Sequence, residues 1–85
     1  MNFRLLIVDD EKNIRSGLAK ALQMDGYEVE QAEDGQEALK VLLKSEIDLI
    51  ISDLRMPKLS GEELLKKVVR AYPTVAVRIM TGTVG

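Results

Sequence analysis

The chain has 85 residues, so it is at most one domain, and its net charge of −2 comes from interspersed acids and bases without the basic stripe of a nucleic-acid-binding surface. Apolar residues make up 46% and charged residues 31% of the sequence. A disordered chain would have fewer apolar residues, so the composition excludes this class of protein. Cysteine and histidine are absent, which excludes disulfides, thiolate or histidine metal sites, and Ser-His or Cys-His catalysis. Any bound metal must be a hard cation held by oxygen, such as magnesium, calcium or manganese.

The sequence contains no sign of a membrane segment. No apolar run approaches the roughly 18 residues of a membrane span, and the amino terminus leads directly into a strand-like run without the layout of a signal peptide. We therefore expect a cytoplasmic protein, and the lack of cysteine agrees with a reducing compartment.

The pattern of apolar residues predicts four strands that alternate with three helices. Continuous apolar runs are typical of strands buried on both faces, whereas the alternating run YEVEQA is typical of an edge strand. In chain order, the predicted strands are 4–8, 27–32, 48–52 and 75–80. Strands that alternate with helices indicate right-handed crossovers and one parallel α/β sheet with helices on both faces.

Helix boundaries are predicted by local signals. Asp34 and Ser60 each precede a glutamate by three residues and form capping-box patterns, and Gly26 supplies a left-handed residue at the end of the first helix. The predicted helices are 11–25, 34–44 and 60–71. Their expected inward-facing residues are Ile14, Leu18, Ala21, Leu22, Ala38, Leu39, Leu42, Leu43, Leu64, Leu65, Val68 and Val69.

Three aspartates follow two of the predicted strands. Asp9 and Asp10 come directly after the first strand and Asp53 after the third, while Thr81 follows the fourth. Parallel strands place their carboxyl ends at one edge of the sheet, where α/β proteins bind ligands. If the first crossover runs to an edge strand, the first and third strands are neighbours and these carboxylates lie close together. Like charges so close raise each other's pKa or need a cation, and magnesium fits best.

A simpler interpretation exists for one of these aspartates. Asp10 stands before a predicted helix and is explained equally well as its N-cap. Asp53 is harder to explain in this way, because it ends a buried strand and is followed by Leu-Arg-Met-Pro. Two buried strands that both end in aspartate favour a site over capping alone.

Over its whole length the chain resembles the receiver domain of bacterial two-component response regulators. The resemblance is carried by LLIVDDEKNIRSGL, DLIISDLRMPKLSG and VRIMTG: an acidic pair, an aspartate followed by Met-Pro and Gly, and a Thr-Gly pair, each after a strand. The Leu-Arg-Met-Pro and Met-Thr-Gly segments are similar to those of nitrogen-regulation-type transcriptional activators.

The resemblance implies a flavodoxin-like fold and roles for particular residues. Asp53 would be the phosphoacceptor that takes a phosphoryl group from a sensor histidine kinase, and Thr81 the switch hydroxyl. Asp9, Asp10, Asp53 and the backbone carbonyl of Arg55 would bind Mg²⁺. The resemblance also implies that the chain would not be an enzyme for a separate substrate, because, if competent, it would catalyse only its own phosphorylation and dephosphorylation.

The sequence also departs from the family pattern. The family pattern is a five-stranded sheet with strand order 2-1-3-4-5. Residues 1–85 are therefore expected to form a partial receiver domain, without the last helix-strand-helix portion and without the family's lysine that follows the fifth strand. Strand 75–80, which contains Arg78, would then be an open edge, and we expect a homodimer through it. The alternative function is a truncated receiver fragment that mainly self-associates and does not signal. A magnesium-dependent phosphatase is less favoured, since it would carry an Asp-x-Asp motif.

Overall fold

The computed structural model describes residues 3–53 and 59–80, which form a four-stranded parallel sheet and three helices. The strands are β1 (Arg4–Val8), β2 (Glu28–Ala32), β3 (Leu49–Asp53) and β4 (Ala76–Met80). The helices are α1 (Lys12–Met24), α2 (Gly35–Lys44) and α3 (Gly61–Ala71). Each predicted element is present, with ends that differ by at most one residue.

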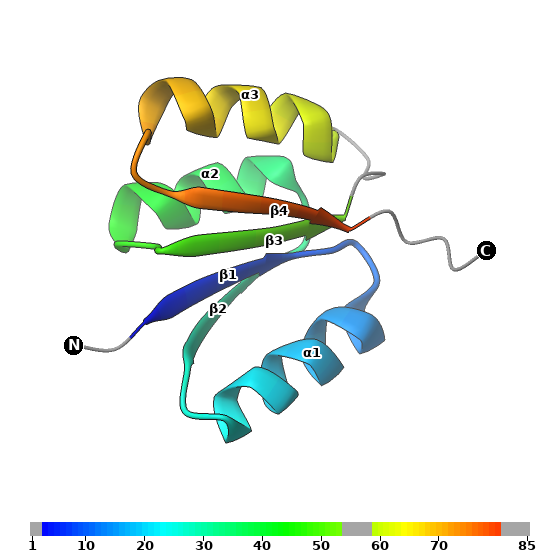
Figure 1. Ribbon diagram of the computed structural model, residues 1–85. Coiled ribbons are helices and arrows are strands. Elements are labelled where there is room, and N and C mark those ends of the chain that lie inside the picture. The colour runs from blue at the N-terminus through cyan, green and yellow to red at the C-terminus, as the bar shows by residue number, and fades with distance from the viewer. Residues whose placement is uncertain (1–2, 54–58, 81–85) are drawn as a thin grey trace.

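The sheet lies between two helical layers. Helix α1 covers one face, and α2 and α3 cover the other (Figure 1). The strand order is β2-β1-β3-β4, so the first crossover runs to the edge strand β2 and the chain then returns to place β3 beside β1. This arrangement confirms the predicted three-layer, flavodoxin-like fold.

Strand register aligns the ends of β1 and β3. Leu5 pairs with Leu49 and Val8 pairs with Ser52, and all the strand pairs are parallel. Asp9 and Asp53, which directly follow Val8 and Ser52, therefore lie at the same edge of the sheet.

The main core lies between the sheet and the α2–α3 layer. Leu6, Ile50, Leu64 and Val68 are fully buried there, because alternate strand residues and one stripe of each helix face this layer. On the opposite face Ile7 is also fully buried, so β1 is covered on both sides, as its continuous apolar run predicts. Each such side chain contributes roughly 1.5–3 kcal/mol to the free energy of folding.

The capping residues and the helix-ending glycine predicted from the sequence are found at the helix ends. Asp34 caps α2 by accepting a hydrogen bond from the Glu37 N–H at 2.8 Å, and Ser60 forms a capping box with Glu63 at the start of α3. Gly26 has a φ of 97° and ends α1, with its N–H bonded to the Gln23 carbonyl.

Four residues expected to face the core are exposed. The exposed fractions are 57% for Ile14, 78% for Leu43 and 58% for Val69, and Ala21 is exposed as well, so the predicted inward orientation is wrong for each. Leu43 and Val69 directly follow Leu42 and Val68, which are buried. Because successive helix residues are rotated by about 100°, only one of two adjacent apolar residues can face the sheet centrally.

Across residues 3–53 and 59–80, no helix is both long enough and apolar enough to span a membrane.

Candidate functional site

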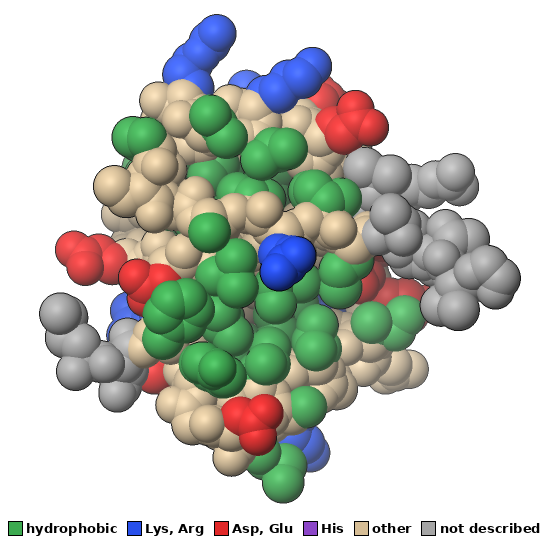
Figure 2. All heavy atoms as spheres, in the orientation of Figure 1, with side chains coloured by type: hydrophobic (Ala, Val, Ile, Leu, Met, Phe, Trp, Pro, Cys, Tyr) green, Lys and Arg blue, Asp and Glu red, His purple; other side chains and the backbone are tan. Residues whose placement is uncertain are grey.

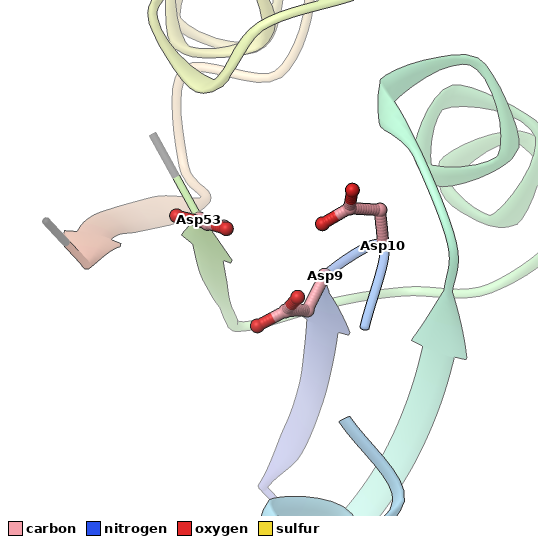
Figure 3. Close-up of side chains that lie close together, drawn as sticks. All are labelled: Asp9, Asp10 and Asp53. Atoms are coloured by element: carbon pink, nitrogen blue, oxygen red, sulfur yellow. The ribbon is translucent and has the colours of Figure 1, made fainter. Parts of the chain in front are cut away.

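Three carboxylates meet at the carboxyl edge of the sheet. Asp9 and Asp10 directly follow β1, and Asp53 is the last residue of the adjacent strand β3. Each offers a carboxylate oxygen, and these oxygens lie within 4.8 Å of one another (Figure 3). We call these three residues the acidic cluster.

The members of the acidic cluster differ in exposure. Asp9 is only 5% exposed, Asp53 is half-buried and Asp10 is exposed. Burial raises the pKa of the Asp9 carboxyl group above its ordinary value, and the nearby negative charges of Asp53 and Asp10 raise the pKa further. Ionisation of Asp9 is therefore less favourable than that of an exposed aspartate, and a bound cation would offset this cost.

Hydrogen bonds fix Asp9 in place. Its Oδ1 accepts a hydrogen bond from the Glu11 N–H at 2.9 Å, and its N–H donates to the Ala32 carbonyl at 3.2 Å. Its carbonyl oxygen accepts a hydrogen bond from Arg15 Nη1 at 2.7 Å. Asp9 thus extends the β1–β2 ladder by one residue while its side chain turns toward α1.

The N-cap interpretation of Asp10 is wrong. The N-cap position of α1 is Glu11, whose side chain makes no capping hydrogen bond. The carboxylate that bonds a backbone N–H at the helix entrance belongs to Asp9, one residue earlier. Asp10 is consequently left at the surface of the acidic cluster.

The other predicted site residues, Thr81 and Arg55, lie outside the described residues. No sequence motif predicts Arg15 as a site residue. Its position in the first two turns of the helix that follows the acidic pair is the sequence feature that could have indicated it. Its contact with Asp9 depends on a long side chain that reaches back six residues.

The donor set of the acidic cluster suits a hard divalent cation. All of its donor atoms are carboxylate oxygens, which Mg²⁺ prefers, and the half-buried position concentrates their negative charge. No nitrogen or sulfur ligand is available, because the sequence has no histidine or cysteine.

A parallel α/β sheet with an acidic cluster at its carboxyl edge defines a class of ligand-binding proteins, and comparison with known sequences gives the family within that class. The family described as "Response regulator receiver domain" matches residues 5–84. The chain therefore belongs to the response regulator receiver domain family.

Two curated relatives illustrate the match. Response regulator receiver protein Anae109_2439 of Anaeromyxobacter sp. (strain Fw109-5) is 41% identical over 81 residues, which are 95% of this chain and 34% of that protein. Transcriptional regulatory protein GlrR of Escherichia coli (strain K12) is 40% identical over 78 residues, which are 92% of this chain and 18% of that protein. The chain thus spans about a third, or less, of the length of these relatives. The match to GlrR weakly supports the resemblance to transcriptional activators.

Solved structures share the fold. Chemotaxis protein CheY4 of Vibrio cholerae superposes with a TM-score of 0.93 at 38% identity, over 100% of this chain and 72% of that chain. Response regulator protein TrrA of Thermotoga maritima, in complex with Mg(2+)-BeF, has a TM-score of 0.81 at 42% identity, over 91% of this chain and 65% of that chain.

Proposed function

We propose that the chain is the phosphoacceptor module of a two-component phosphorelay, in which Asp53 accepts a phosphoryl group from a sensor histidine kinase. The observation that carries the proposal is the acidic cluster at the carboxyl edge of a receiver-family sheet. A cytoplasmic location and the absence of activity on any separate substrate belong to the same proposal.

Asp53 supplies the nucleophile in this proposal. Its carboxylate oxygen forms a bond to phosphorus as the bond between phosphorus and the histidine nitrogen breaks, and the imidazole leaves with that electron pair. The product is an acyl phosphate on Asp53. Its half-buried position at the end of β3 favours this role, since a rigid strand orients the carboxylate while one side stays accessible.

Asp9, Asp10, Asp53 and the backbone carbonyl of Arg55 would hold Mg²⁺. When bound, the ion supplies positive charge that offsets the cluster carboxylates and the phosphoryl oxygens. The complex of TrrA with Mg(2+)-BeF supports this assignment, because TrrA has the same fold and is 42% identical to this chain. Thr81 is the proposed hydroxyl that binds the phosphoryl group and reports its presence.

The test uses a small phosphodonor, such as acetyl phosphate, with Mg²⁺ and intact-mass measurement. We expect one phosphoryl adduct on the wild-type chain, no adduct on Asp53→Asn, and a retained adduct on Asp25→Asn, which removes an exposed aspartate remote from the acidic cluster. Chelation of Mg²⁺ is expected to abolish the reaction. An adduct that persists on Asp53→Asn contradicts the proposal.

We also propose that the chain forms a homodimer through the β4 edge. Within the described residues β4 pairs only with β3, and its residues Ala76 and Arg78 are exposed. Figure 2 shows apolar side chains gathered on the face between α3 and α1, with a cationic side chain among them. Self-association without signalling is the alternative function, which a folded wild-type chain that takes up no phosphoryl group would favour.

A further inference from the structure

Arg15 holds the peptide group that joins two members of the acidic cluster. Its Nη1 donates a hydrogen bond of 2.7 Å to the carbonyl oxygen of Asp9, and that carbonyl belongs to the peptide bond between Asp9 and Asp10. Because this peptide group joins Asp9 to Asp10, its orientation affects how the two carboxylates face Asp53. The half-buried guanidinium therefore acts on the geometry of the acidic cluster without belonging to it.

The backbone groups of Asp9 and one of its carboxylate oxygens are already engaged. The N–H is bonded to the Ala32 carbonyl, the carbonyl oxygen to Arg15 and Oδ1 to the Glu11 N–H, so Oδ2 is the carboxylate oxygen that a cation would bind. A buried carboxylate in such a framework loses little conformational freedom when it binds a ligand.

We propose that Arg15 is a positioning residue for divalent-cation binding, which it promotes by orienting the Asp9–Asp10 peptide despite its own positive charge. This inference rests on the proposed function, because it assigns the cation site to the acidic cluster.

Charge alone predicts the opposite effect. Arg15 forms no ion pair with Asp9 or Asp10 in the described chain. Its positive charge opposes the rise in the pKa of Asp9 that burial causes, but the same charge repels a cation bound nearby. It shares an open hollow with Glu33 and Glu37, whose carboxylates lower the local positive potential. Removal of a bystander cation would tighten Mg²⁺ binding, whereas removal of a positioning residue weakens it. The sign of the change therefore distinguishes the two roles.

The experiment compares Mg²⁺ dissociation constants of the wild-type chain, Arg15→Gln, Arg15→Lys and Lys12→Gln, measured by calorimetry at fixed ionic strength. We expect Arg15→Gln to weaken binding by roughly tenfold, as for other groups that orient metal ligands. Arg15→Lys is expected to recover part of the loss, since its ammonium can still donate to the Asp9 carbonyl. Lys12→Gln is the matched control: it removes the same charge from an exposed position of α1, so binding stays equal or tightens slightly.

Amide hydrogen exchange in EDTA gives a second readout that does not depend on the ion. In Arg15→Gln we expect faster exchange of the Glu11 N–H, which is bonded to Asp9 Oδ1, and unchanged exchange of the Ala38 N–H in α2. Equal or tighter Mg²⁺ binding by a folded Arg15→Gln overturns this inference alone. A folded wild-type chain that does not bind Mg²⁺ overturns both this inference and the proposed site.

Discussion

At the scale of single residues, Asp9 is a buried carboxylate beside two others. Because burial and like charges both disfavour its ionised form, the acidic cluster lowers the stability of the fold when no cation is bound. The raised pKa of Asp9 means that the folded chain binds this proton more tightly than the unfolded chain does. The free energy of unfolding therefore falls as pH rises from the ordinary pKa of aspartate through the raised folded value.

Asp9→Asn is expected to remove this cost. The amide oxygen can still accept the Glu11 hydrogen bond, while the buried charge and its repulsion by Asp10 and Asp53 are gone. We expect the free energy of unfolding at neutral pH in EDTA to rise by about 1 kcal/mol, the usual size of a single substitution's effect. Urea unfolding from acidic to neutral pH measures it, with Asp25→Asn as the control. A less stable Asp9→Asn protein would contradict this account.

The residues of the cluster were predictable from the sequence, and their environment was not. A doublet of aspartates after one apolar run and an aspartate after another predict carboxylates at one sheet edge, because strand direction alone determines the edge. Which aspartate bonds the helix entrance, and that Arg15 reaches back to it, depend on side-chain conformations that no spacing specifies.

At the scale of helices, two glycines differ in the space that surrounds the position of a Cβ. A Cβ on Gly35, the first residue of α2, would lie 2.7 Å from the Cβ and Cδ2 of Leu59, whereas a Cβ on Gly17 in α1 would have nothing within 4 Å. The missing side chain of Gly35 therefore permits a close approach between the start of α2 and Leu59. Gly17 makes no such contact and only weakens its helix.

Gly35→Ala and Gly17→Ala are accordingly expected to have opposite effects. Gly35→Ala lowers the free energy of unfolding by about 1–3 kcal/mol through overpacking, and Gly17→Ala raises it by roughly 0.5–1 kcal/mol through helix propensity. Thermal and urea unfolding of both variants test this. In Gly35→Ala/Leu59→Gly, which also removes the facing Cβ, the loss should be smaller than the sum of the single losses, and an additive result would refute the proposed contact.

Helix ends were predictable because capping is local, as Asp34 and Ser60 illustrate. The buried face was predictable only in part. Adjacent apolar pairs such as Leu42–Leu43 and Val68–Val69 satisfy the helical period with either member inward, so only the position of the sheet decides which member is buried.

At the scale of the whole molecule, strand order controls the site. The apolar pattern predicts strands and their direction, but it makes β1 and β3 neighbours only on the condition that the first crossover reaches an edge. The resemblance to receiver domains supplies this strand order, because in the family pattern the second strand is at the edge and the first and third strands are neighbours. A single sequence contains no pairing information between residues such as Val8 and Ser52, which lie far apart along the chain.

The β4 edge gives a prediction at the same scale. Size-exclusion chromatography with light scattering is expected to show a dimer for the wild-type chain. Ala76→Lys should shift it toward monomer, because a charged side chain on an edge strand opposes pairing with a second sheet. Ser16→Lys adds the same charge at an exposed position of α1 and should leave the mass unchanged. A folded wild-type monomer at every concentration would rule out the dimer.

The parallel direction of the strands also has a practical consequence. All of the chemistry discussed above lies at the carboxyl edge, and the turn before β3, which contains Glu46, lies at the opposite edge. Glu46 is exposed and the chain has no native cysteine, so Glu46→Cys would provide a single thiol for a fluorophore or for attachment to a sensor chip. Immobilised in this way, the protein would present its acidic cluster away from the support and toward incoming phosphodonors.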